Sequence, residues 1–250
     1  MKETFQNTVF KLVDDHSFND AAIKIFRYQY ENNTVYRKFT DLLKIHPEKV
    51  NSIKKIPFLP IEFFKSHRVI TGDYFPAGYF QSSGTTAGTT SNHFYENLSV
   101  YEQSFIAGFR QFFGDVEDYC IIALLPSYME QQNSSLIFMV KKLIELSGHS
   151  KSGFYLQNHD ELRDALGLLE TKGQKTLLLG VTFAFLDLIE KHRFRLKNTL
   201  IFETGGMKGR RKELVREELH NILCDGFGVK KIHSEYGMTE LFSQAWSKGD

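Results

Sequence analysis

Short apolar runs alternate with amphipathic stretches from residue 119 almost to the end of the chain. Continuous apolar runs are typical of strands buried on both faces, and the stretches between them have helical periodicity. The predicted strands are YCIIALLP (119–126), GFYLQ (153–157), KTLLLGV (175–181), NTLIFETGG (198–206) and VKKIHSEYG (229–237). The predicted helices are SSLIFMVKKLIELSGH (134–149), DELRDALGLLETKG (160–173), FAFLDLIEKH (183–192) and RRKELVREELHNILCDG (210–226). This order predicts an α/β fold, a mainly parallel sheet flanked by helices.

The last of these helices is predicted to place Val215, Leu219, Ile222 and Leu223 on one apolar face. The predicted helices at 134–149 and 160–173 end near Gly148 and Gly173, because glycine commonly follows the last helical residue.

The first part of the chain has a different pattern. Residues 2–54 are charged and aromatic with helical spacing, and two apolar stripes are expected: Ile23, Phe26 and Tyr30, then Val35, Phe39, Leu42 and Leu43. The segment IPFLPIEFFKSH (56–67) contains two prolines, which stop helices and favour an extended path. The sequence predicts a helical N-terminal arm over 1–80 packed on an α/β core over 81–250.

Composition excludes several classes of function. With 31 basic and 30 acidic residues the net charge is +1, so the chain has no excess of positive charge that would attract nucleic acid or an anionic membrane. The two cysteines, Cys120 and Cys224, form no disulfide framework and fit a reducing compartment. The start of the sequence contains no apolar signal segment, and no apolar run is long enough to insert into a membrane. A cytoplasmic protein is expected.

Polar and small residues follow four of the predicted strands. These segments are PSYMEQQNSS (126–135), GVTF (180–183), ETGGMKGR (203–210) and SEYGMTE (234–240). Ligands of parallel sheets bind outside the carboxyl ends of the strands, so a single polar crevice is expected there. Glu203, Glu235 and Glu240 would supply carboxylates to it, while Gly205 with Gly206 fits a plain turn as well as a close approach to a ligand.

The stretch FQSSGTTAGTTSNHFY (80–95) is rich in Ser, Thr and Gly between aromatic residues. Such a run can be a flexible linker, or a loop whose N–H and hydroxyl groups surround a polyphosphate. It is not a Walker loop, because counting from Gly84 places Thr89 where the second glycine should stand. It is not a dinucleotide fingerprint either, because no strand–glycine–helix unit begins here.

Three motifs together resemble the adenylate-forming superfamily: SSGTTAG (82–88), ETGGMKGR (203–210) and YGMTE (236–240), in that order. The chain is most similar to LuxE-type acyl-protein synthetases, through IPFLPIEFFKSH (56–67), LLPSYMEQQNSSLIFM (124–139) and EYGMTELFSQAWSKGD (235–250). The resemblance implies an ATP-dependent acid–thiol ligase that uses Mg2+ and converts a fatty or other carboxylic acid to an acyl-adenylate. The acyl group would pass to a thiol of a protein cysteine, an acyl carrier protein or coenzyme A, with reductase or transferase subunits as further partners.

The resemblance also implies roles for individual residues. Tyr236 would flank the adenine, Thr239 would contact the α-phosphate and Glu240 would bind the metal, with Gly205 and Gly206 along the base. The loop that holds the outer phosphates would comprise Ser82, Ser83, Gly84, Thr85, Thr86 and Gly88. Thr86, Thr239 and Glu240 are the residues expected to act in catalysis, where metal and fixed dipoles must offset the charge of two anionic reactants.

Two departures from the superfamily pattern keep other interpretations open. The lysine that usually follows the loop is replaced by a zone with Thr89, Thr90 and His93, and the sequence stops at Asp250. The small C-terminal domain, with its catalytic lysine, and the acyl-accepting cysteine are therefore expected to be absent from this chain. The alternatives are an aryl or acyl coenzyme A ligase of the phenylacetate type, and a non-catalytic acyl- or nucleotide-binding module.

Several conspicuous residues have simpler explanations. Cys120, Cys224 and His233 are expected to pack rather than react, and no Cys/His cluster has zinc spacing. An acyl tunnel or ordinary core packing would explain four aromatic residues, Tyr128, Phe138, Phe183 and Phe185. Thr239 and Glu240 also fit the start of a helix over TELFSQAW (239–246), with Thr239 at the N-cap.

Overall fold

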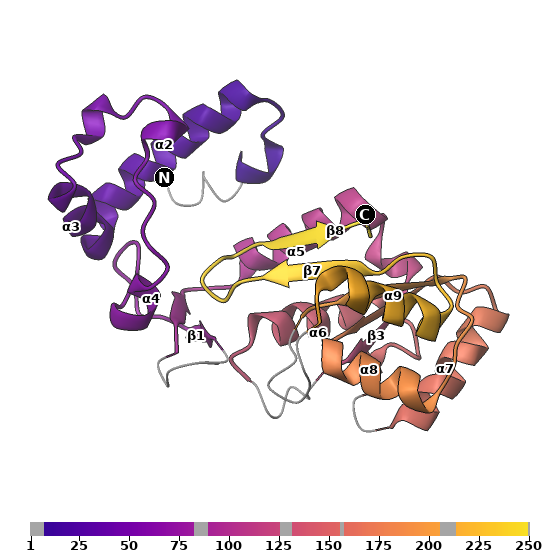
Figure 1. The fold of residues 1–250 in the computed structure, drawn as a ribbon. Coiled ribbons are helices and arrows are strands. Elements are labelled where there is room, and N and C mark those ends of the chain that lie inside the picture. Colours follow the sequence, from indigo (N-terminus) through magenta and orange to yellow (C-terminus); the bar gives the residue numbers. More distant parts are fainter. Residues whose placement is uncertain (1–7, 83–89, 126–131, 156–157, 206–213, 250) are drawn as a thin grey trace. The chain divides into compact units, whose positions relative to one another are not determined.

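The computed structural model describes residues 8–82, 90–125, 132–155, 158–205 and 214–249 (Figure 1). The chain forms two compact units. The N-terminal unit comprises Met1–Tyr101 together with Thr239–Phe242, and the second unit comprises Glu102–Met238 together with Ser243–Asp250. The segment that follows the last predicted strand therefore belongs to the N-terminal unit, although the sequence on either side of it does not.

Two helices dominate the N-terminal unit, α2 (Asp15–Asn32) and α3 (Thr34–Leu42). The Asp14 side chain begins α2 by accepting from the Ser17 N–H at 2.7 Å, and Asn33 begins α3 in the same way. A short helical turn, η1 (Val9–Lys11), precedes them, and three more follow: η2 (Pro47–Lys49), η3 (Ile53–Lys55) and α4 (Phe63–Ser66). Such side-chain caps satisfy N–H groups that have no partner within the helix.

The core of this unit contains Phe26, Tyr36 and Val50. Phe26 lies in the first predicted stripe, but the second stripe was partly wrong. Leu42 and Leu43 are 83% and 51% exposed, because α3 ends there, and its buried positions are Tyr36 and Thr40. Tyr36 packs edge-on against Phe26 and donates its hydroxyl proton to the Pro57 carbonyl at 2.6 Å, which anchors the proline-containing segment.

A separate two-stranded antiparallel sheet completes the described part of the N-terminal unit. It consists of β1 (Gly78–Gln81) and β2 (Asn92–Tyr95), with Phe80 opposite His93. These strands enclose the Ser/Thr/Gly stretch, so that stretch joins a strand to a strand and not a strand to a helix. Residues 83–89 of the stretch lie outside the described residues.

The second unit contains a six-stranded sheet in the order β4-β3-β5-β6-β7-β8. The strands are β3 (Cys120–Leu124), β4 (Gly153–Phe154), β5 (Thr176–Gly180), β6 (Thr199–Glu203), β7 (His233–Gly237) and β8 (Gln244–Ser247). All neighbours pair in parallel except β7 and β8, which are antiparallel. The predicted α/β fold with a mainly parallel sheet is confirmed. The order of strands reverses between β3 and β5, where open α/β sheets commonly bind ligands.

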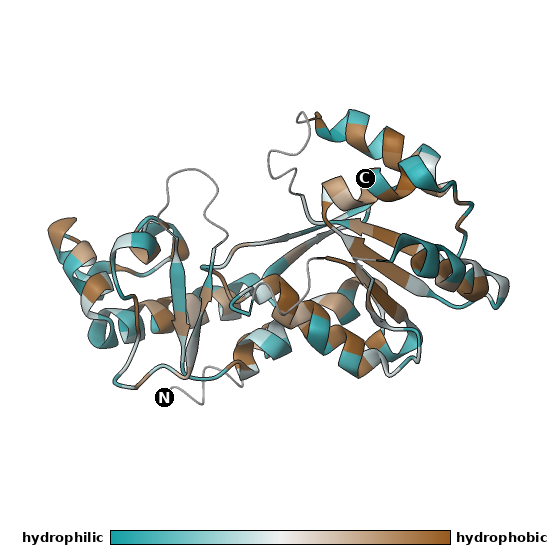
Figure 2. Cartoon of the chain, turned by 90° about the horizontal axis from the view of Figure 1, so that it is seen from below, coloured by the Kyte–Doolittle hydropathy of each residue, from teal (hydrophilic) through white to brown (hydrophobic). Residues whose placement is uncertain are grey.

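Helices cover both faces of this sheet (Figure 1). On one face lie α5 (Ser99–Phe113) and α6 (Ser135–Ser147), and on the other lie α7 (His159–Thr171), α8 (Thr182–Lys191) and α9 (Arg216–Phe227), while η4 (Val116–Asp118) precedes β3. In Figure 2 the central strands of the sheet are largely brown, in agreement with the complete burial of β3 and β5. Burial on both faces explains the continuous apolar runs in the sequence.

The ends of the helices show where sequence periodicity sufficed. Gly148 follows α6 with a φ of 60° and Gly173 lies just beyond α7 with a φ of 64°, both as predicted, in the left-handed backbone that glycine adopts without strain. The last helix, α9, ends instead at Gly228, with a φ of 68°, two residues beyond its predicted end. However, α9 begins at Arg216, and the predicted residues 210–213 lie outside the described residues. Val215 is its N-cap and is 70% exposed, and Ile222 is 38% exposed. The predicted apolar face was therefore wrong at these two positions and right at Leu219 and Leu223, which are buried.

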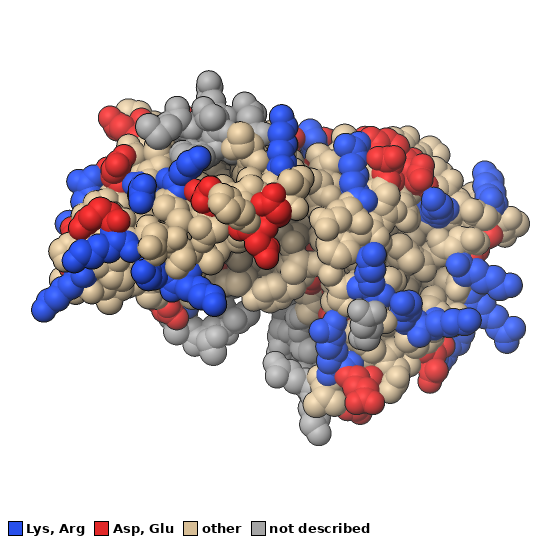
Figure 3. All heavy atoms as spheres, turned by 90° about the horizontal axis from the view of Figure 1, so that it is seen from above, with Lys and Arg blue, Asp and Glu red and all other residues tan. Residues whose placement is uncertain are grey.

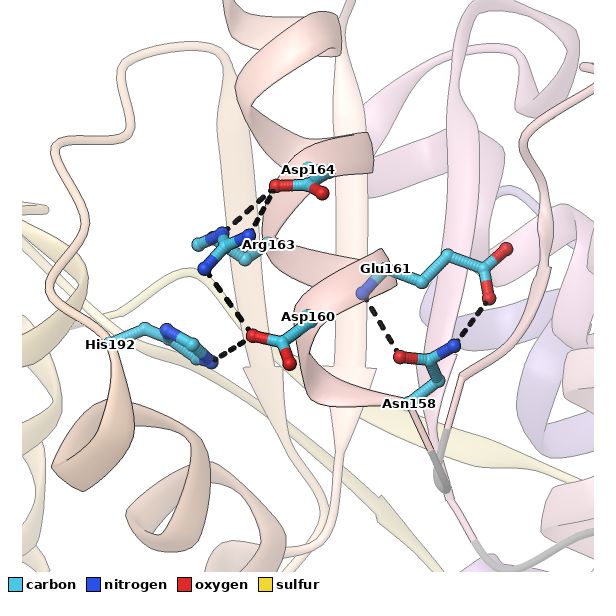
Figure 4. Close-up of polar contacts among 6 residues, drawn as sticks. All are labelled: Asn158, Asp160, Glu161, Arg163, Asp164 and His192. Atoms are coloured by element: carbon cyan, nitrogen blue, oxygen red, sulfur yellow. Dashed lines mark hydrogen bonds and ion pairs between the residues drawn. The ribbon is translucent and has the colours of Figure 1, made fainter.

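A group of polar side chains fixes the start of α7 (Figure 4). Asn158 accepts from the Glu161 N–H at 3.1 Å and donates to the Glu161 carboxylate at 3.0 Å. One turn along, Arg163 pairs with Asp160, which also lies 3.5 Å from His192 at the end of α8. Since the carboxylates and Arg163 are largely exposed, this group is a helix cap and a surface connection between two helices.

Basic and acidic side chains both occur across the view of Figure 3, and basic ones gather at its lower right. Among the described residues, no helix combines the length and apolar character that a membrane crossing needs.

Candidate active site

The carboxyl ends of β5 and β6 are joined by backbone hydrogen bonds. The Thr204 N–H donates to the Gly180 carbonyl at 3.1 Å, and the Thr182 N–H donates to the Gly205 carbonyl at 3.2 Å. The predicted polar segments after these strands therefore lie together at one edge of the sheet. Two predicted parts of the site lie outside the described residues: Gly206 with the residues that follow it to 213, and Tyr128 after β3.

Glu203 organises this edge. Its carboxylate accepts from the Gly205 N–H at 2.7 Å, the Ser234 hydroxyl at 2.8 Å and the Thr182 hydroxyl at 3.4 Å. Gly205 has a φ of 70°, and the space beside its Cα is open. The carboxylate thus holds the backbone of Gly205 in a conformation that leaves room for a neighbouring group. The backbone of Gly205 is therefore fixed by the protein itself.

Two residues of this cluster were not predicted from the sequence. His220 on α9 places Nε2 3.7 Å from the Glu203 carboxylate, and Arg216 donates to the Ser234 hydroxyl at 2.9 Å. The two residues are one turn apart on the same helix, so they share a face. That spacing was visible in the sequence, but nothing in the sequence indicated that this face turns toward Glu203.

Glu235 does not serve as an open carboxylate, contrary to the expectation that it lines the crevice. It is 5% exposed and lies opposite Trp246 in the β7–β8 pair. Burial raises the pKa of Glu235 to about 7; the hydrogen bond from Gln244 opposes the rise and the charge of Glu203 adds to it. Among the described residues, Glu235 Oε1 and Trp246 Nε1 are buried without a hydrogen-bond partner. Glu203 is also buried, at 8% exposure.

In contrast to Glu235, Tyr236 stands at the end of β7 with 62% of its surface exposed. An exposed aromatic ring at the carboxyl end of a strand can stack on a flat ligand such as a nucleobase. The stacking role that the sequence resemblance implied for Tyr236 stays a prediction.

In the N-terminal unit, the base of the Ser/Thr/Gly loop is closed by Ser82 and Ser91. The Ser82 N–H donates to the Ser91 carbonyl at 3.1 Å, and the Ser91 N–H donates to the Ser82 hydroxyl at 2.9 Å. The other predicted phosphate-binding residues, Ser83, Gly84, Thr85, Thr86 and Gly88, lie outside the described residues.

The strand that follows this loop, β2, contacts the segment that contains Thr239 and Glu240. On β2, His93 Nδ1 lies 3.1 Å from the Thr239 carbonyl and donates to it, since a carbonyl only accepts. The His93 ring stacks on Phe242 at 4.1 Å with an interplanar angle of 16°. Burial lowers the pKa of His93, while this hydrogen bond and the charge of Glu240 oppose the change. The N-terminal unit therefore brings the base of the loop and the Thr239–Glu240 pair together.

Thr239 and Glu240 form a turn that leads into β8, so the alternative prediction of a helix over 239–246 was wrong. Strand pairing with β7 and burial of Trp246 outweigh the local capping pattern. No cluster of three or more His, Cys, Asp or Glu side chains suited to a metal occurs among the described residues. Of the three glutamates expected in the crevice, Glu240 alone is not buried.

The other conspicuous residues are packing residues. His233 is buried and stacks on Phe202 at 4.9 Å, as expected. Burial raises the pKa of both thiols, Cys120 and Cys224, which disfavours the reactive thiolate. Phe183 and Phe185 are buried on α8, where Phe185 packs against Phe227 of α9, so core packing accounts for them.

The fold and these polar strand ends define an α/β protein of the kind that binds ligands at the carboxyl edge of a parallel sheet. A family model makes the assignment more specific. The chain belongs to the LuxE acyl-protein synthetase family, whose model matches residues 10–245. A search of curated proteins gave no match. Membership implies an acyl substrate, an acceptor protein and the use of ATP.

Proposed function

We propose that the protein activates a fatty carboxylic acid with ATP, forming an acyl-adenylate and pyrophosphate, and then passes the acyl group to a thiol of a protein or carrier. Family membership supports the acyl-protein synthetase activity. The observation that carries the finer proposal is the His93 contact. It connects β2, which leaves the Ser/Thr/Gly loop, to Thr239 and Glu240. The N-terminal unit would thus contain the loop for the outer phosphates, the Thr239 hydroxyl for the α-phosphate and the Glu240 carboxylate for the metal.

The residues at the edge of the sheet have complementary roles in this proposal. Glu203 holds Gly205 so that its backbone lies along the adenine, and Tyr236 stacks on the base. Because Glu203 accepts hydrogen bonds from a backbone N–H and two hydroxyls, it is a positioning residue and not a metal ligand. Little proton transfer is needed, since the attacking group is already a carboxylate.

A magnesium ion fits the residues present. Magnesium commonly takes one or two carboxylates and completes its shell with phosphate oxygens and water, and Glu240 can supply one carboxylate. When bound, the ion would offset the negative charge of ATP and the acid as they approach. Thr239, beside Glu240 in the chain, would donate its hydroxyl to the α-phosphate, where negative charge develops.

ATP–pyrophosphate exchange in the presence of fatty acids tests the proposal. Glu240→Gln retains the shape of the side chain but removes its charge, and exchange should fall on the order of 100-fold or more. Glu62→Gln is a matched control, because Glu62 is exposed in the same unit and its side chain caps no helix. Unchanged exchange with unchanged magnesium dependence in Glu240→Gln would show that the assignment of Glu240 is wrong.

A further inference from the structure

The N-terminal unit contains a cavity of about 740 Å3. Its walls come from α2, the segment around η3, β2 and residues near Glu240, all within that unit. The volume lies in the range of roughly 300–1,000 Å3 that is typical of small-molecule sites. Much of the lining is aliphatic or aromatic, including Phe18, Ala22, Ile25, Ile56, Phe58 and Phe94.

Several polar groups in this lining already have protein partners. Asn33 donates to the Thr71 hydroxyl at 3.0 Å and accepts from the Tyr36 N–H at 3.0 Å. The Tyr36 hydroxyl donates to the Pro57 carbonyl at 2.6 Å. Because these groups are committed to the protein, this part of the cavity offers a ligand mainly apolar surface, which favours an apolar chain over a polar molecule.

His93 and Glu240 also line the cavity and belong to one part of its wall, since the charge of Glu240 acts on His93. Glu240 follows Thr239 in the chain, and His93 holds the Thr239 carbonyl, so this wall adjoins the groups proposed to bind the α-phosphate. None of the described residues in the lining is Lys or Arg. The cavity therefore combines a mainly apolar lining with the polar side chains of His93 and Glu240, and no Lys or Arg accompanies them among the described residues.

We infer that this cavity holds the aliphatic chain of the carboxylic acid, with the carboxyl group at the wall formed by His93 and Glu240. This assignment rests on the proposed function, and it locates the chain in the N-terminal unit and not among Phe183 and Phe185, which fill the core of the second unit. Since no cation lines the cavity among the described residues, burial of the chain supplies most of the affinity and the charge of the head group supplies little.

The test is direct binding of a fluorescent polyene fatty acid to the whole chain without ATP, followed by displacement with saturated acids of increasing length. Each added methylene should tighten binding about fourfold until the chain exceeds the cavity. The alcohol of matching length should compete at least as well as the acid, because Glu240 repels a carboxylate. Affinity that does not depend on chain length, or an alcohol that fails to compete, would overturn the inference.

Two pairs of variants locate the site. Phe58→Ser and Phe75→Ser each remove an exposed phenylalanine, 74% and 98% exposed, but only Phe58 lines the cavity. Ala22→Phe fills the cavity from α2, while Ala107→Phe places the same group on an exposed position of α5. The Phe58 and Ala22 variants should bind about fivefold to tenfold more weakly, and the other two should bind like the unaltered protein. Equal effects within each pair would overturn the placement.

Failure of this inference is distinguishable from failure of the proposed function. Pyrophosphate exchange that persists while the Phe58 and Ala22 variants bind fatty acid normally would overturn the placement of the chain alone. Length-dependent binding at the cavity without exchange for any acid would support the placement and contradict the adenylation proposal.

Discussion

Glu235 has an unusual environment for a glutamate, and this permits a quantitative prediction. It is buried in β7 opposite Trp246, and burial raises its pKa from 4.5 to about 7. The folded protein therefore keeps the carboxyl protonated up to about pH 7, whereas the unfolded chain loses the proton near its ordinary pKa. A raised pKa in the folded state means that stability is fully present below the unfolded pKa and is lost as the pH rises through the folded value.

The size of the effect follows from the shift. A change from 4.5 to about 7 corresponds to about 3 kcal/mol in the free energy of unfolding, lost between those two pH values. Glu235→Gln retains the size of the side chain and has no proton to lose. The variant should therefore be more stable than the unaltered protein at pH 8, by up to about 3 kcal/mol, and the two should differ little near pH 5.

Urea denaturation at pH 5 and pH 8 measures this difference. Trp246 is the only tryptophan and lies opposite Glu235, so its fluorescence reports unfolding at the site itself. Glu217→Gln, at an exposed position in the first turn of α9, is the control and should change stability by less than about 1 kcal/mol at both pH values. If Glu235→Gln gains no stability between pH 5 and pH 8 relative to the unaltered protein, the assignment of a buried, protonated carboxyl is wrong.

Two further substitutions test the fold and the site. Gly228→Ala should lower the free energy of unfolding by about 3 kcal/mol or more, because its Cβ would lie 2.6 Å from the Phe194 carbonyl oxygen in a left-handed backbone. Gly148→Ala has the same backbone strain but open space, so urea denaturation should show a loss of only about 1 kcal/mol. Tyr236→Ala should weaken ATP binding about tenfold in calorimetry with stability changed by less than about 1 kcal/mol, and unchanged affinity would contradict its stacking role.

The large sheet was predictable because its signal is local. Strands such as β3 and β5 are buried on both faces, which requires a continuous run of apolar residues that the sequence shows directly. The same is true of the helix ends marked by Gly148 and Gly173, since a left-handed residue is a local need.

Segments decided by distant partners were not predictable to the same extent. The residues from Thr239 to Trp246 carry a helix-capping pattern, yet they form a turn and a strand because β7 provides a pairing edge and α5 covers Trp246. In α3, the buried face contains Tyr36 and Thr40 and not Leu42, because packing against Phe26 selects the face.

The site shows the same limit. The motifs named Tyr236, which is exposed, and Glu240, which is partly exposed, and the roles of both at a nucleotide stay predictions. However, the role of Glu203 depends on Ser234, 31 residues away, and on the face that α9 turns toward it. No periodicity encodes such a hydrogen bond, so Glu203 was expected to be an open carboxylate when it is in fact committed to the protein.

The four residues Thr239–Phe242 affect how the chain folds during synthesis. Phe242 packs on Phe80, His93 and Tyr101, and the contact between His93 and Thr239 spans 146 residues of sequence. At roughly 5–20 residues per second, a ribosome takes on the order of ten seconds to make that span, during which the aromatic surface of the N-terminal unit is incomplete. A nascent chain interrupted before Thr239 would expose this surface to other chains. Loss of Thr239–Phe242 should therefore promote aggregation through the N-terminal unit.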